Sequence, residues 1–167
     1  MQIPTLHTAR LELRAYVATD RAAFIATYTD PEVMQYVDGA LEPEAAGALF
    51  DGILSGGRHR VFAAWCAERG GVTVGHGALL REDDGLALGY ILPRKHWGHG
   101  YATEIAQALV QYAIDSLGRT QLTATTDPEN IASGRVLEKA GMRLVARVDN
   151  VDGPHLVYQA IASNKPT

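Results

Sequence analysis

The spacing of hydrophobic and polar residues predicts a helical first third of the chain. Alternation over residues 10–14 predicts a short strand, and Thr19-Asp20 is typical of the cap of a helix whose apolar residues recur at helical spacing. Asp30-Pro31 predicts a second, short helix that ends at residues 38–39. Residues 44–54 predict a third helix, which a Ser-Gly-Gly sequence ends.

The middle of the chain has the pattern of a β-meander. Three apolar stretches, at residues 61–67, 72–80 and 86–92, are rich in strand-forming residues. Gly70-Gly71 and the Asp-Asp-Gly sequence at 83–85 separate them, and both are typical turn sequences. We therefore expect three consecutive antiparallel strands.

A long amphipathic segment follows the meander. Ile105, Leu109 and Tyr112 share one face of a predicted helix over residues 100–117, and residues 121–125 predict the next strand. Two strands joined by a helix of this length are expected to pair in parallel through a right-handed crossover.

The last quarter of the chain predicts one more helix and a hairpin. The helix begins at Asn130 and ends at Gly141, and the strands cover residues 144–151 and 155–161 around an Asp-Gly-Pro turn. Residues 1–167 contain no repeat or linker, so we expect one α/β domain. Its sheet is mixed and mostly antiparallel, with a central parallel pair flanked by helices.

Composition narrows the class of protein. The chain has 167 residues, of which 47% are hydrophobic, and no apolar run is long enough to span a membrane. The formal charge of -4 argues against nucleic acid as a partner and suits a cationic acceptor such as an amine. The single cysteine, Cys66, and the absence of a signal-peptide pattern predict a cytoplasmic location.

The junction between the strand at 86–92 and the long helix carries the most informative motif. Gly98 and Gly100 allow backbone N–H groups to turn inward, and the first turn of the helix adds unpaired N–H groups and the positive end of its dipole. Such a junction favours an anion such as a diphosphate. A lone Gly-x-Gly sequence is more often only a tight turn.

A second motif makes the combination specific. Trp97-Gly-His-Gly-Tyr-Ala-Thr-Glu is followed by Asn130-x-x-Ser-x-x-Val-Leu-Glu-Lys-x-Gly, and residues 8–14 and 30–34 also match. In this order and spacing the chain resembles the GNAT superfamily of acyl-CoA-dependent N-acyltransferases, and most closely its RimJ/RimL-type branch. The resemblance spans most of the chain. Tryptophan at the first loop position departs from the general pattern of the superfamily and fits this branch.

The resemblance implies acetyl-CoA as the acetyl donor, with its pantetheine arm between the splayed parallel strands. It also implies that Asn130 binds that arm. Arg135 and Lys139 on the last helix are candidates to bind the 3′-phosphate, and the alternative is that they are ordinary exposed helix charges. The residues expected to bind the coenzyme are Ile91, Leu92, Trp97, Gly98, His99, Gly100, Tyr101, Ala102, Thr103, Asn130, Ser133 and Arg135.

The sequence defines the proton donor and the general base less clearly than it defines the coenzyme loop. Many relatives donate a proton to the leaving thiolate from a tyrosine at the position of Leu137, so Ser133 is the expected substitute. Many also carry a glutamate base where this chain has Ala87. The alternatives for a base or a residue of the substrate gap are Tyr90, His76, Glu82, Asp83 and Asp84.

Other chemistry is not expected. His96 and His99 have no further ligand at a recognisable spacing, so we expect no metal, and Cys66 fits a core position. The predicted activity is direct transfer of an acetyl group to a primary amine, either a protein N-terminus or a small molecule. A catalytically silent acyl-CoA-binding domain and a homodimer remain open alternatives.

Overall fold

The computed structural model describes residues 2–57 and 60–162. Within them one mixed sheet has the order β1-β2-β3-β4-β5-β6-β8-β7, and its pairs are antiparallel except β5–β6, which is parallel. The strands are β1 (Leu6–His7), β2 (Glu12–Arg14), β3 (Val61–Arg69), β4 (Val72–Glu82), β5 (Gly85–Ile91), β6 (Gln121–Thr126), β7 (Arg143–Asn150) and β8 (Gly153–Ile161). The helices are α1 (Arg21–Tyr28), α2 (Pro43–Leu54), α3 (Tyr101–Gln111) and α4 (Ile131–Lys139). This architecture confirms the predicted α/β fold.

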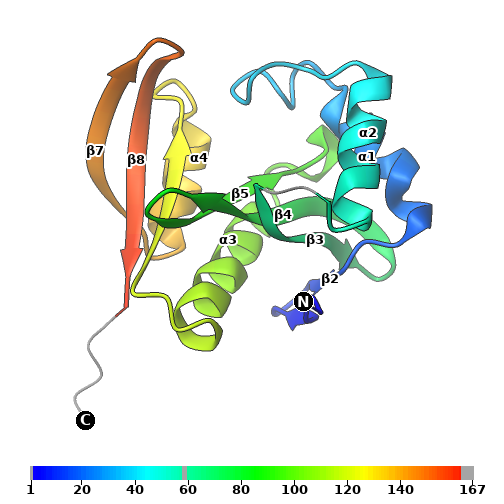
Figure 1. Ribbon diagram of the computed structural model, residues 1–167, viewed down its shortest axis with the longest axis horizontal. Coiled ribbons are helices and arrows are strands. Elements are labelled where there is room, and N and C mark those ends of the chain that lie inside the picture. The colour runs from blue at the N-terminus through cyan, green and yellow to red at the C-terminus, as the bar shows by residue number, and fades with distance from the viewer. Residues whose placement is uncertain (1, 58–59, 163–167) are drawn as a thin grey trace.

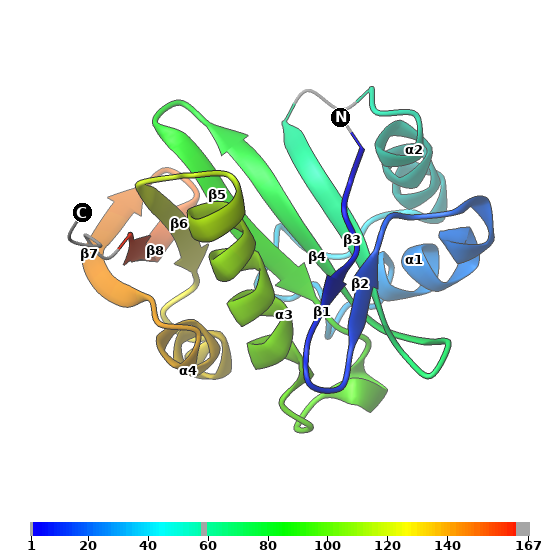
Figure 2. The same cartoon turned by 90° about the horizontal axis from the view of Figure 1, so that it is seen from below.

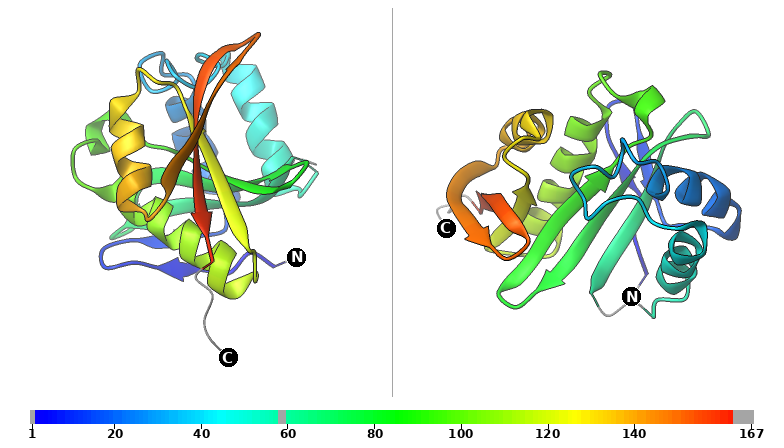
Figure 3. Two further views of the ribbon diagram at one scale, coloured as in Figure 1. Left: turned by 90° about the vertical axis from the view of Figure 1, so that its left-hand side faces the viewer. Right: turned by 90° about the horizontal axis from the view of Figure 1, so that it is seen from above.

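Helices cover both faces of the sheet. The left view of Figure 3 shows α2 on one side of the central strands and α3 on the other. An aromatic cluster lies under α1 and α2, and the larger aliphatic core lies under α3 and α4. α3 packs closely on β4 at Gly75 and Gly77. A Cβ atom at either glycine would lie only 2.9 Å from Ile105, so the absence of a side chain permits this contact.

The parallel pair holds together at one end only. Ala87 and Thr123 are the Cα partners of the β5–β6 ladder, whereas β5 stays in register with β4 along its full length. Figure 1 shows β6, β8 and β7 turned crosswise to β3, β4 and β5. On the edge away from β4, residues 88–91 of β5 therefore pair with no strand among the described residues, and this edge faces a gap. The strands diverge without a bulge in β5, because its register with β4 is unbroken.

Most predicted elements are confirmed to within a few residues, with one clear error. The short helix expected over residues 30–39 is wrong: the segment consists of turns. Asp30 Oδ1 accepts a hydrogen bond from the Glu32 N–H, 3.0 Å away, so the side chain caps a local turn. Asp38 (φ 54°) and Gly39 (φ 81°) then have left-handed backbone conformations, which a helix cannot continue through.

Two features of the helices also bear on the predictions. The helix expected over 100–117 is present as α3 followed by a π-helical turn at Tyr112–Ser116, and Gly118 (φ 64°) ends it. In the described part of the chain no helix is both long and apolar enough to cross a bilayer.

Candidate active site

The chain between β5 and α3 forms a tight, exposed loop at the open end of the parallel pair. The Trp97 indole N–H donates to the Leu92 carbonyl (2.8 Å), which ties the start of the loop to the end of β5. Gly98 (φ 76°) and Gly100 (φ 80°) have left-handed backbone conformations, and Gly100 is the N-cap residue of α3. Side chains other than glycine are strained in this conformation, so the two glycines permit the turn.

The loop presents a series of unused backbone donors. Among the described residues, no carbonyl or side chain accepts from the N–H groups of residues 98–103, and Glu104 is the first to bond back, to the Gly100 carbonyl (3.2 Å). Together with the N-terminal end of the α3 dipole, these donors favour a bound anion. The arrangement fits the diphosphate of a coenzyme A molecule.

The N-terminus of α4 faces the same gap. The Asn130 Oδ1 accepts from the Ser133 N–H (3.1 Å), so Asn130 is the N-cap of α4. Its side-chain amide NH₂ has no acceptor among the described residues and remains a free donor. A pantetheine amide in the gap would find a hydrogen-bond donor here.

Ser133 and Tyr90 meet across the gap, although 43 residues separate them in the sequence. Their hydroxyl oxygens are 2.7 Å apart, and the Tyr90 hydroxyl also lies 3.3 Å from the Ser133 carbonyl. Burial raises the pKa of Tyr90 to about 12, so the phenol is protonated at neutral pH and acts as a donor rather than a base. Leu137, where many relatives carry tyrosine, is buried in the core. Ser133 and Tyr90 thus form a hydroxyl pair at this end of α4, and the Tyr158 hydroxyl lies close by, 2.8 Å from where a Cβ at Gly134 would be.

His76 lies away from this pair, on the face of the sheet that α1 and α2 cover. Its ring is 3% exposed, with Nδ1 2.7 Å from the Tyr16 hydroxyl and Nε2 3.3 Å from the Thr27 hydroxyl. Burial lowers its pKa to about 4, so the imidazole is neutral at pH 7. Both ring nitrogens are engaged in the aromatic core, and the structure does not bring His76 to Ser133.

The acidic turn between β4 and β5 is also remote from the pair. Glu82 is five residues along β4 from Gly77, the partner of Tyr90, which is about 16 Å along a strand. Its carboxylate accepts from the Thr123 hydroxyl (2.9 Å), while Asp83 and Asp84 are exposed in the turn. The structure therefore places these candidate bases at the closed end of the parallel pair.

The other residues predicted to bind the coenzyme lie in two places, either next to the glycine loop or on α4. Ile91 ends β5, Leu92 is buried against Gly75, and Ala102 and Thr103 lie in the first turn of α3. Arg135 instead lines a hollow of about 280 Å³ between α4 and β8, with Glu138 and Tyr158. The structure does not bring Arg135 to the glycine loop, and Lys139 ends the same helix.

The groups considered for metal or thiol chemistry have other contacts. The His99 ring stacks on Tyr101 with centroids 5.6 Å apart, and the His96 ring lies 6.3 Å from the same tyrosine. Asp20, Cys66 and Glu68 have potential ligand atoms within 4.8 Å of one another, but the Arg14 guanidinium binds both carboxylates. Burial raises the pKa of Cys66 to about 11, so its thiol is protonated.

Comparison with known proteins agrees with this geometry. The family model described as an acetyltransferase (GNAT) domain matches residues 10–143. The uncharacterized N-acetyltransferase p20 of Bacillus licheniformis is 32% identical over 141 residues, which cover 80% of this chain and 79% of p20. The crystal structure of an acetyltransferase from Agrobacterium tumefaciens is 28% identical, with a TM-score of 0.81 over 96% of this chain and 95% of that one.

A more distant solved structure shows the same fold with ligands. The aminoglycoside acetyltransferase AAC(6′)-Ib, in complex with paromomycin and acetyl-CoA, has a TM-score of 0.77 at 16% identity, over 91% of this chain and 93% of that one. The fold and the matching family model thus define an acyltransferase domain. The chain belongs to the GNAT family of acetyltransferases, which act with acetyl-CoA.

The sequence indicates Tyr90 and Ser133 as separate candidates, and it does not predict the contact between their hydroxyl groups. Local patterns carry no signal for a contact between a strand residue and a helix residue that are far apart in the chain. The register of β5 with β4, together with the N-cap of α4, is what places the two hydroxyl groups side by side.

Proposed function

We propose that the protein transfers the acetyl group of acetyl-CoA directly to a primary amine, with both substrates bound at once. The observation that supports this most strongly is the position of the hydroxyl pair. Ser133 and Tyr90 stand at the open end of the β5–β6 pair, and the N–H groups of residues 98–103 lie in the loop and first turn at the N-terminal end of α3. Diphosphate at the loop and pantetheine along the gap would bring the thioester to Ser133.

In this reaction the amine nitrogen attacks the thioester carbonyl carbon. A C–N bond forms, the C–S bond breaks, and the electron pair of that bond passes to sulfur. The Ser133 hydroxyl donates its proton to the leaving sulfur, and the Tyr90 hydroxyl stays protonated and donates a hydrogen bond to the Ser133 oxygen. The proton that the amine releases to water balances the one that water returns to Ser133. A backbone N–H near Ile91, in the unpaired part of β5, would polarise the carbonyl oxygen.

The amine must attack in its neutral form. An α-amine has an ordinary pKa of about 8, so roughly a tenth of it is neutral at pH 7. Because His76 is enclosed in the aromatic core and Glu82 lies at the far end of β5, we propose that the proton of the amine leaves to water. Rates should then rise with pH until the amine itself is fully deprotonated.

The acceptor is expected to approach from the side of the sheet under α1 and α2. On that side a Cβ atom at Gly89 would meet nothing within 4 Å, so the backbone of β5 is open there. Both a protein N-terminus, as in the RimJ/RimL-type branch, and a small-molecule amine remain candidates. The aminoglycoside acetyltransferase of the same fold supports the second class.

Release of CoA thiol from acetyl-CoA tests this proposal. It should be measured with N-terminal peptides, polyamines, amino acids and aminoglycosides, and mass spectrometry should find an added acetyl group on the accepting amine. Ser133→Ala should lower kcat by roughly tenfold to a hundredfold with little change in Kd for CoA. Tight CoA binding without turnover on any amine would contradict the proposal and favour a binding domain.

A further inference from the structure

The turn between β1 and β2 holds the glycine loop from outside. Thr8 and Leu11 close this turn, because the Thr8 N–H donates to the Leu11 carbonyl and the Leu11 N–H donates to the Thr8 hydroxyl, each at 2.9 Å. Figure 2 shows the β1–β2 hairpin beside the beginning of α3. The turn lies at residues 8–11, whereas His99 of the loop is 89 residues after Arg10 in the chain.

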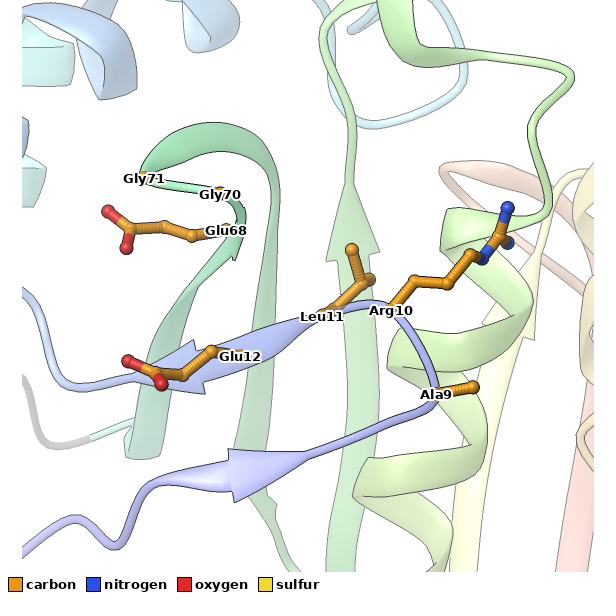
Figure 4. A pocket seen from close by; sticks show the side chains of 7 residues that line it. All are labelled: Ala9, Arg10, Leu11, Glu12, Glu68, Gly70 and Gly71. Atoms are coloured by element: carbon orange, nitrogen blue, oxygen red, sulfur yellow. The ribbon is translucent and has the colours of Figure 1, made fainter.

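Arg10 connects the turn to the loop. In Figure 4 the side chains of Glu12 and Glu68 point to one side of the hairpin, and Arg10 extends to the other side, to the first turn of α3. Its guanidinium binds the Glu104 carboxylate through Nε, and Nη2 donates to the His99 carbonyl at 2.8 Å. The same guanidinium lies 4.8 Å from the centroid of the Tyr101 ring.

Glu104 completes the connection. Its second carboxylate oxygen accepts from the Thr8 hydroxyl and from the Arg10 N–H, so both oxygens are used by the hairpin. Burial opposes ionisation of this carboxyl, but the hydrogen bonds from Thr8 and Arg10 outweigh it and lower the pKa of Glu104. We call Thr8, Arg10 and Glu104 together the hairpin clamp.

We propose that Arg10 of the hairpin clamp is the positioning residue that orients the coenzyme loop for its diphosphate. In a trans peptide the C=O and N–H groups point in opposite directions. Because Arg10 binds the His99 carbonyl, the Gly100 N–H of the same peptide points away from the hairpin. The donor is thereby fixed on the side of the loop that faces away from the hairpin before the coenzyme arrives.

Charge gives the clamp a second effect on the same site. Glu104 lies in the first turn of α3, where an unpaired carboxylate would repel a diphosphate at the helix N-terminus. The Arg10 guanidinium pairs with this carboxylate and compensates its charge. Loss of Arg10 would therefore both release the His99 carbonyl and leave a negative charge beside the anion site.

This inference rests on the proposed function. Comparing the binding of two ligands shows which of the two, the inference or the proposed function, fails. Coenzyme A carries the diphosphate, whereas pantetheine has the same thiol arm without it. Calorimetric titration of wild type, Arg10→Met and Arg21→Met with both ligands gives six dissociation constants. Arg21 is a matched control, because it pairs with Asp51 on the exposed faces of α1 and α2, away from the loop.

For Arg10→Met we expect about a tenfold weaker Kd for coenzyme A, or about 1.4 kcal/mol, and no change for pantetheine. Arg21→Met should bind both ligands like wild type. Glu104→Gln in the Arg10→Met background should recover part of the lost affinity, since it removes the uncompensated charge. Circular dichroism spectra and thermal unfolding of all variants report whether the fold is kept.

The outcomes are distinguishable. If wild type binds coenzyme A no more tightly than pantetheine, the loop does not hold the diphosphate and the proposed function fails. If wild type prefers coenzyme A and Arg10→Met keeps the same preference, only the role of Arg10 is overturned. Equal weakening of both ligands in Arg10→Met would show a general structural role and would also overturn it.

Discussion

The two faces of the sheet are built in opposite ways. On the face of α3 and α4, the proposed site consists of backbone N–H groups at the start of α3 and of the Asn130 amide and the Ser133–Tyr90 hydroxyl pair at the start of α4. On the face of α1 and α2, polar side chains such as His76 and Tyr16 are closed into an aromatic cluster with Phe24 and Phe50. Polar groups on the face of α3 and α4 therefore keep donors without an acceptor among the described residues, while polar groups on the face of α1 and α2 bond to one another.

This difference explains why the sequence reveals the donor and not the acceptor. Binding a diphosphate through backbone groups requires residues that free the backbone, and glycine at positions 98 and 100 marks them in the sequence. An acceptor site formed by side chains around an aromatic core needs no special backbone conformation and therefore no such glycines. Its specificity depends on side chains that would serve equally well as packing.

The largest expected effect is a loss of coenzyme A affinity caused by a substitution in the glycine loop. Gly100→Glu places a carboxylate at the anion site, on a residue with φ 80° whose Cβ would lie 3.2 Å from Arg10 Nη2. We expect coenzyme A to bind roughly a thousandfold more weakly, or about 4 kcal/mol. Calorimetry measures this loss. Gly118→Glu, also at positive φ (64°) and at the other end of the same helical segment, is the control for backbone strain and should bind normally.

A second change tests whether the opposite face is a closed core. The pKa of His76 is lowered to about 4 from an ordinary 6.5, so the unfolded chain binds its proton more readily than the folded one. The stability that depends on neutral His76 is complete above pH 6.5 and is lost as the pH falls toward 4, by up to about 3 kcal/mol. Urea unfolding at a series of pH values measures it.

His76→Gln should remove this part of the pH dependence while lowering stability at pH 7. His7→Gln, on exposed β1, is the control and should keep the wild-type profile. If His76→Gln unfolds with the same pH dependence as wild type, the histidine is not held neutral in the core. A large loss of kcat with unchanged stability would instead place His76 in catalysis.

The smallest effect concerns the contact that joins β5 to α4. Tyr90→Phe removes the hydroxyl 2.7 Å from Ser133 Oγ but keeps the ring, so kcat should fall by roughly threefold to tenfold with Kd for coenzyme A unchanged. Steady-state kinetics and calorimetry separate the two constants. Tyr112→Phe, where the ring packs on Trp65, is the matched control. An equal fall in both variants would argue against a role for Tyr90 in supporting Ser133.

The parts of the fold that local signals determine could be predicted from the sequence. Turn sequences with glycine and the Asn130 cap set the strand and helix bounds to within a few residues. The segment 30–39 could not, because Asp30-Pro31 opens a helix and a capped turn equally well. Only the left-handed backbone at Asp38 and Gly39 decides against the helix, and Asp38 gives no sequence signal for it.

Contacts between distant residues could not be predicted at all. Glycine spacing indicates the coenzyme loop, but Arg10 and Glu104, which are 94 residues apart, meet only because the β1–β2 hairpin lies along the sheet beside α3. In the same way, Ser133 had a predicted role and Tyr90 an open one. Their pairing depends on the divergence of β6 from β5, which brings α4 over the end of the gap.

The central claim is that the backbone of residues 98–103 receives the diphosphate of the coenzyme. Heteronuclear NMR of ¹⁵N-labelled protein, titrated with coenzyme A and then with pantetheine, tests it most directly. With coenzyme A the largest amide shifts should fall on residues 98–103 and on the Asn130 side chain. With pantetheine the Asn130 shift should remain, while the loop amides stay near their free positions. Loop amides that do not move with coenzyme A, or that move equally with both ligands, would contradict the account.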